Sequence, residues 1–192
     1  MELYGKGTHL TDIGALSGVV REASELVTDT LLIAPPGQKK LLDSVLGRCK
    51  GGSSSVGFES SSSGLSNQEV HWLMTHPKTE WLEYLVFRES LRRISNERIV
   101  PEFPSYVLIE PTSVCNLRCV MCFQVDETFT KKPYMGMMEI GLFKRVVDEC
   151  AERGAKAITL ASRGEPTLHP DFEMMLDYLS RYKFLEIKVN TN

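Results

Sequence analysis

The second half of the chain alternates short apolar runs with stretches of helical periodicity. Apolar runs at 106–109, 157–161 and 185–189 have the length of strands that are covered on both faces. Between them, apolar residues recur at helical spacing in 139–153 and 171–182, which predicts two amphipathic helices. Strands that alternate with helices favour parallel pairing with right-handed crossovers. The pattern therefore predicts an α/β fold that forms part of a (β/α) barrel, with about three strand–helix units present.

The first part of the chain has a different pattern. An amphipathic stretch at 13–26 precedes an apolar run at 30–34, and a second helical stretch follows at 39–46. This order predicts a small α/β segment over residues 1–50, with a strand at the apolar run. Residues 51–65 are rich in glycine and serine and lack the apolar side chains needed for a packed core, so we expect a flexible linker there.

The pattern over residues 66–103 predicts a helical segment that leads into the second half of the chain. Ser66 and Glu69 have the spacing of a capping box at the start of a short helix, which Pro77 ends. A longer helix is predicted at 79–95, where bulky apolar residues recur at helical spacing and would pack on a core.

Composition and charge argue against two classes of protein, those that bind nucleic acid and those that span a membrane. The chain has 192 residues, 42% of them hydrophobic and 24% charged, and a net charge of −3. Its 22 basic residues do not outnumber its 25 acidic ones, which argues against a nucleic-acid partner. No apolar run approaches the ~20 residues that cross a bilayer, so no membrane role is expected. We expect a cytoplasmic protein in a reducing compartment.

Three of the five cysteines lie close together after the first predicted strand of the second half. Cys115, Cys119 and Cys122 form a C-x3-C-x2-C pattern, which could ligate three irons of a four-iron cluster and leave the fourth open to another ligand. A structural zinc site usually has four protein ligands, and three close cysteines cannot all pair in disulfides. Zinc and plain thiols remain alternatives. Cys150, on the apolar face of a predicted helix, and Cys49 are expected to be non-ligands.

A second candidate motif follows the next predicted strand. Gly164, Glu165 and Pro166 form a turn after the run at 157–161. In (β/α) barrels the functional groups gather in the loops after the strands, and neighbouring strands are ~4.8 Å apart. The cysteine loop and this turn could therefore hold one small ligand between them. Taken alone, Glu165 would be interpreted as a surface carboxylate beside a turn proline, and its place after a strand and after the cysteine loop favours the functional interpretation.

The cysteine spacing and the Gly-Glu-Pro turn together resemble the radical SAM superfamily. The resemblance implies that residues 104–192 are the N-terminal half of a radical SAM barrel, truncated at its third strand. This region looks most like the branch whose members carry a cluster-binding C-terminal domain of the SPASM type. It also implies a [4Fe-4S] cluster on Cys115, Cys119 and Cys122, with S-adenosylmethionine (SAM) bound at the open iron.

The same resemblance assigns further residues to the cofactor site. The backbone of Gly164 and the carboxylate of Glu165 would contact the amino group of SAM, and Met121 stands where the family often has an aromatic residue near the adenine. Arg163 replaces the first glycine of the usual Gly-Gly-Glu-Pro turn, so that Ser162 and Arg163 could contact the ligand or the cluster loop instead. The implied cofactor-binding residues are Met121, Ser162, Gly164, Glu165, Pro166 and Asn190.

The expected function is reductive cleavage of SAM to a 5′-deoxyadenosyl radical that abstracts hydrogen from a peptide, protein or metabolite. A reductant protein such as flavodoxin or ferredoxin would be a partner. The alternative is a non-enzymatic iron–sulfur electron carrier or redox sensor with the same cysteines. Because three parallel strands leave an unpaired edge, we expect the 192-residue chain alone to be inactive.

Overall fold

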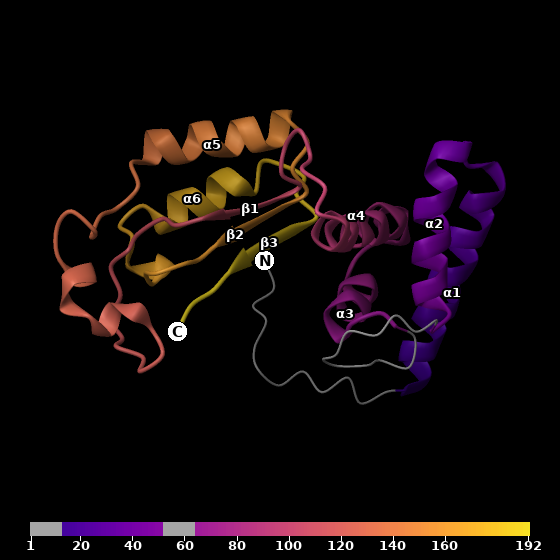
Figure 1. Ribbon diagram of the computed structural model, residues 1–192, viewed down its shortest axis with the longest axis horizontal. Coiled ribbons are helices and arrows are strands. Elements are labelled where there is room, and N and C mark those ends of the chain that lie inside the picture. Colours follow the sequence, from indigo (N-terminus) through magenta and orange to yellow (C-terminus); the bar gives the residue numbers. More distant parts are fainter. Residues whose placement is uncertain (1–12, 52–63) are drawn as a thin grey trace. The chain divides into compact units, whose positions relative to one another are not determined.

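The computed structural model describes residues 13–51 and 64–192, which belong to two compact units, Met1–Val100 and Pro101–Asn192 (Figure 1). Most of the predicted linker at 51–65 lies outside the described residues. No helix within the described ranges is both long enough and apolar enough to cross a membrane.

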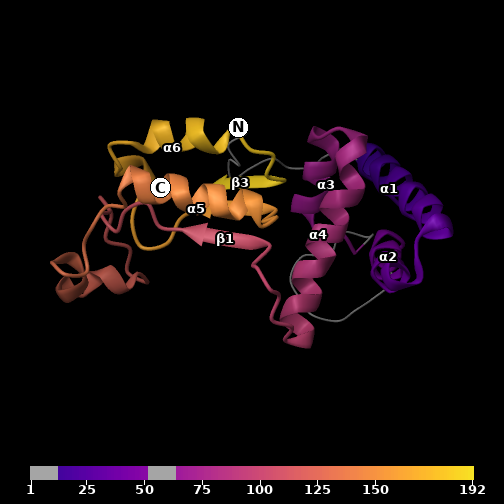
Figure 2. The same cartoon turned by 90° about the horizontal axis from the view of Figure 1, so that it is seen from above.

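The described part of the first unit is helical. Helices α1 and α2 pack against each other, and α4 contacts both of them (Figure 2). Buried aromatic side chains from α3 and α4 form much of the core, where the rings of Trp72 and Tyr84 stack with centroids 3.8 Å apart. The helices are α1 (Ile13–Ile33), α2 (Pro36–Cys49), α3 (Asn67–Thr75) and α4 (Lys78–Glu97).

The strand predicted at 30–34 is wrong, because helix α1 continues to Ile33. The hydroxyl groups of Thr28 and Thr30 donate to carbonyls one turn earlier, which suits a helical backbone. Leu32 and Ile33 are 76% and 86% exposed, so the apolar run is not a buried strand. A short apolar run cannot be told from a helix end by its pattern alone. The described part of residues 1–50 is therefore helical and not α/β.

The predicted capping box is confirmed at the start of α3. The Ser66 hydroxyl accepts the Glu69 backbone N–H, and the Glu69 carboxylate accepts the Ser66 backbone N–H. The same carboxylate is fully buried, and both of its oxygens accept from Nη2 of Arg48, at 2.6 and 2.7 Å. Arg48 also contacts Glu89 on α4, so the ion cluster joins three helices.

The second unit contains a parallel sheet in the order β1–β2–β3, formed by Tyr106–Ile109, Ala157–Leu160 and Glu186–Val189. The parallel pairing confirms the prediction from the alternating pattern. Helices α5 (Ile140–Glu152) and α6 (Phe172–Leu179) connect the strands. The described ranges contain these three strands and no others, so the barrel itself stays a prediction.

Helices α5 and α6 cover one face of this sheet (Figure 1). Side chains of alternate strand residues, including Ile109, Ile158 and Leu160, pack with Phe143, Val147 and Met175 of the helices in one core. Cys150 is part of this core, as predicted. The anchored strands present their C-terminal ends to one edge of the sheet.

Candidate functional site

Three loops meet at the C-terminal edge of the sheet. The ladder continues one step past the strands, because Ala161 donates its N–H to Ile109 and Asn190 donates to Leu160, each at 3.0 Å. Since the strands are parallel, the chain segments that follow them leave the sheet at the same edge. The cysteine loop, the Gly-Glu-Pro turn and the segment after β3 are therefore neighbours, as the sequence predicted for the first two.

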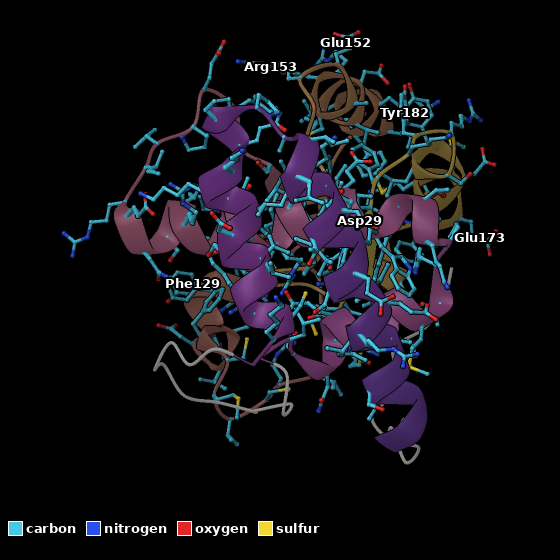
Figure 3. The ribbon with its side chains drawn as sticks, turned by 90° about the vertical axis from the view of Figure 1, so that its right-hand side faces the viewer. Asp29, Phe129, Glu152, Arg153, Glu173 and Tyr182 are labelled. Atoms are coloured by element: carbon cyan, nitrogen blue, oxygen red, sulfur yellow. The ribbon has the colours of Figure 1, made fainter. Side chains whose placement is uncertain are left out.

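The base of the cysteine loop is firmly held. Thr112 forms an antiparallel bridge with Met137, and the Ser113 N–H donates to Gly136 at 3.0 Å. The amide of Gln124, which is buried, donates to the Ser113 carbonyl at 2.7 Å. Farther along, Phe129, which is labelled in Figure 3, packs edge-on against Phe123. The loop thus leaves from a fixed point and returns to a fixed point.

The three cysteines lie between these anchors. Cys115 and Cys122 are half-buried and Cys119 is exposed, and all three are free thiols. A backbone hydrogen bond from Cys122 to Cys119 holds a turn at 2.9 Å. Within the described residues, however, no three His, Cys, Asp or Glu side chains are grouped so that they could hold a metal ion. The donor set fits an iron–sulfur cluster in its chemistry, with three accessible thiols on one loop.

The other two cysteines have the opposite environment. Cys49 and Cys150 are both buried. Burial raises the pKa of the Cys49 thiol to about 11 and also raises the pKa of Cys150. Because the thiolate is the metal ligand, these environments disfavour metal binding.

The Gly-Glu-Pro turn packs directly on the base of the cysteine loop. A side-chain carbon added to Gly164 would lie 1.9 Å from the Thr112 carbonyl oxygen, so only glycine fits without movement. The next N–H, of Glu165, donates to the Val114 carbonyl at 2.8 Å. Just before these residues, Ser162 has φ of 118°, a strained value for a residue with a side chain. The two motifs therefore form one structural unit.

The Glu165 carboxylate is 3% exposed and fully engaged within the protein. Its Oε1 accepts the N–H and hydroxyl of Thr167 and the hydroxyl of Thr191, at 2.6 to 3.1 Å. Its Oε2 accepts the Asn192 N–H at 2.9 Å. Burial alone would raise the pKa of Glu165, but these hydrogen bonds outweigh it and keep the pKa below its usual range. Glu165 is thus an anion that ties the turn to the segment after β3.

One further hydrogen bond connects the segment after β3 to the cysteine loop. The Asn192 side chain donates to the side-chain oxygen of Asn116, inside the cysteine loop, at 2.9 Å. Pro166, the remaining residue of the turn, is buried and begins a short 3-10 helix. Met121 is 92% exposed, and Asn190 is also exposed. The structure therefore brings Gly164 and Glu165 against the cysteine loop, whereas the roles predicted for Met121 and Asn190 stay predictions.

Sequence reasoning missed two parts of this site. Glu110, the first residue after β1, binds Arg163 through the side chain and the backbone. Thr191 binds Glu165 through its hydroxyl. The signal for Glu110 was its place directly after a strand and before the cysteines. Nothing in the sequence pattern pairs Thr191 with Glu165.

Comparison with known proteins bears on the same region. Residues 109–192 match the family model of the Radical SAM superfamily. A relative from Pyrococcus furiosus, described as the tungsten-containing aldehyde ferredoxin oxidoreductase cofactor-modifying protein, is 37% identical over 92 residues. That alignment covers 45% of this chain and 23% of the relative, so the chain spans less than a quarter of that protein's length. No solved structure matches the chain.

The matched range begins at the end of β1 and includes both the cysteine loop and the Gly-Glu-Pro turn. The family match and the structure single out the same region, because the two motifs inside the matched range pack on each other. Residues 109–192 are therefore similar in sequence to the Radical SAM superfamily.

Proposed function

We propose that this chain is part of a radical SAM enzyme that binds a [4Fe-4S] cluster through Cys115, Cys119 and Cys122. The observation that carries the proposal is the packing of Gly164 on Thr112 together with the hydrogen bond from Glu165 to Val114. Through these contacts a loop with three thiols and a turn with a fixed carboxylate share one backbone framework. The family match over residues 109–192 supports the same chemistry.

When bound, the cluster and SAM would supply one-electron reductive cleavage of SAM, and with it a 5′-deoxyadenosyl radical for hydrogen abstraction from substrate. The residues of the chain would bind the cluster and SAM and would orient them. Cys115, Cys119 and Cys122 would hold the cluster as thiolates, and their number would leave the cluster able to bind SAM as well. The turn at Gly164, Glu165 and Pro166 holds the ammonium end, with the Glu165 charge offsetting that cation.

The proposed role of Glu165 can be tested on the reconstituted protein. Glu165→Gln keeps the shape but removes the negative charge that would offset the ammonium group, so SAM should bind about tenfold more weakly, a difference of ~1.4 kcal/mol. Glu173→Gln, on the exposed side of α6, is the matched control and should leave the affinity unchanged (Figure 3). Equal affinities for the two variants in calorimetry would reject the assignment.

The substrate and partners extend this proposal. The name of the Pyrococcus furiosus relative favours a modification reaction on a cofactor-related molecule, and peptides, proteins and other metabolites are the further candidates. A flavodoxin or ferredoxin would supply the electron. We also propose that the three-stranded sheet belongs to a (β/α) barrel and that the protein works in the cytoplasm.

Addition of SAM to the chemically reduced, reconstituted protein tests the function as a whole. The paramagnetic spectrum of the cluster should change, and 5′-deoxyadenosine should appear in the solution. An iron–sulfur electron carrier would show a cluster spectrum that SAM leaves unchanged. A protein that binds zinc and no iron would exclude both readings.

A further inference from the structure

Glu110 and Arg163 form an ion pair that joins the ends of two neighbouring strands. Glu110 directly follows β1, and Arg163 lies in the turn after β2. The Nε of Arg163 donates to both carboxylate oxygens, at 2.9 and 3.0 Å, and its Nη2 donates to Oε1. Planar two-point contact of this kind fixes orientation as well as distance.

The same carboxylate also holds the backbone of the turn. The Arg163 N–H donates to Oε2 at 3.1 Å, and the Ser162 hydroxyl donates to the carboxylate as well. Burial alone would raise the pKa of Glu110, but the hydrogen bonds from Arg163 and Ser162 outweigh it and lower the pKa. One anion therefore receives a side chain, a backbone N–H and a hydroxyl from two consecutive residues.

These contacts surround the strained and crowded part of the turn. On one side of Arg163, Ser162 has φ of 118°, a conformation that persists only where neighbouring groups enforce it. On the other side, Gly164 meets the Thr112 carbonyl with no room for a side chain. Glu110 lies two residues before Thr112, so the ion pair and the Gly164 contact join the same two loops at two points.

We propose that Glu110 and Arg163 are positioning residues, which hold the turn at Gly164 and Glu165 in register with the cysteine loop so that SAM can be bound by both. The inference rests on the proposed function. Neither residue needs to touch SAM, because the pair acts through the backbone of the turn.

A double-mutant cycle tests the pair. Arg163→Met, Glu110→Gln and the double variant are reconstituted anaerobically, and the dissociation constant of SAM is measured by calorimetry. Loss of a supporting contact of this kind typically costs 10- to 100-fold, so each single variant should bind SAM roughly 10- to 100-fold more weakly. Because the two residues act as one unit, the double variant should be no weaker than the weaker single variant.

Two further variants separate positioning from general stability. Arg181→Met removes an exposed pair with Asp177 on α6 and should leave the SAM affinity unchanged. Arg163→Lys keeps the charge without the planar fork and should recover only part of the lost affinity. Iron and sulfide content and the thermal midpoint are measured for every variant, and the positioning variants should keep their iron.

The outcomes distinguish this inference from the function on which it rests. A wild-type chain that holds the cluster yet binds no SAM would reject the proposed function. Wild-type affinity in Arg163→Met, independent losses that multiply in the double variant, or a parallel loss of iron would each overturn the positioning role alone.

Discussion

Glu69 in the helical unit and Glu165 in the sheet unit both carry buried carboxylates that accept several hydrogen bonds from protein groups. The donors to the two carboxylates differ in kind. Glu69 is held by the Arg48 guanidinium and by the capping box, and Arg88 and Arg92 lie within 3.7 Å of it. Glu165 is held by hydroxyl and backbone N–H groups of loop residues.

From this difference we expect a structural role for the Glu69 charge and the proposed cofactor-binding role for the Glu165 charge. In the helical unit the positive charges that compensate the carboxylate come from neighbouring helices, so its effect is to hold helices together. In the sheet unit the neutral donors leave Glu165 with its charge, next to a loop of accessible thiols. Changes in the first cluster should therefore alter stability, and changes in the second should alter cofactor binding.

The largest effect is expected at the cysteine loop. Replacement of Cys115, Cys119 or Cys122 by alanine should abolish the proposed four-iron cluster, because these three residues are its proposed ligands. Iron and sulfide analysis after anaerobic reconstitution measures it. Cys49→Ala and Cys150→Ala are the controls and should keep the full content, and an equal loss in Cys150→Ala would show that the ligand set is wrong.

The next effect is expected in the helical unit. Glu69→Ala leaves Arg48 buried without its main partner, and removal of one member of a buried ion pair typically costs about 3–5 kcal/mol of unfolding free energy. Both tryptophans of the chain, Trp72 and Trp81, lie in this unit, so their fluorescence during urea unfolding reports on it.

The control for this substitution is Arg21→Ala, which removes an exposed pair with Glu25 on α1. It should cost at most about 0.5 kcal/mol. The Glu69→Ala protein should still bind its iron under native conditions. A loss of iron without a loss of unfolding free energy would contradict the division of roles between the two units.

A smaller effect on stability, but a specific one on the site, is expected for Gly164→Ala. The added carbon would overlap the Thr112 carbonyl oxygen, and overpacking of this kind typically costs about 1–3 kcal/mol. The turn must move, so SAM affinity should fall. Gly141→Ala, in α5 with no atom within 4 Å of the added carbon, is the matched control. Equal SAM affinities in calorimetry would show that the close packing has no role in binding.

The smallest effect is expected in the stability of the helical unit at acidic pH. Burial alone would raise the pKa of Glu69, but the charge and hydrogen bonds of Arg48 outweigh it and keep the pKa below its ordinary value of 4.5. The carboxylate therefore stabilises the helical unit at pH above that ordinary value, and this contribution is lost as the pH falls through the lowered pKa. Tryptophan fluorescence at fixed urea should show acid unfolding with a shallower pH dependence in Glu69→Gln. An identical pH dependence in the wild type and in Glu69→Gln would show that Glu69 does not contribute to acid unfolding.

Local patterns in the sequence were enough to identify most elements and both motifs. The alternation of apolar runs and amphipathic helices predicted the parallel sheet, because each pattern depends on neighbouring residues. The same pattern placed the cysteines and the Gly-Glu-Pro turn at one edge. It failed at 30–34, where a short apolar run ends a helix, since so few residues fit either structure.

Only the tertiary structure decided how the site is held together. Glu110 meets Arg163, Gly164 meets Thr112, and Thr191 and Asn192 meet Glu165, in each case between segments that follow different strands. No periodicity links such residues, because their proximity arises from the order and register of the strands. The sequence by itself determined which chemical groups are present and at which edge of the sheet. The pairing of the strands decided which carboxylate is tied to a loop and why Gly164 admits no side chain.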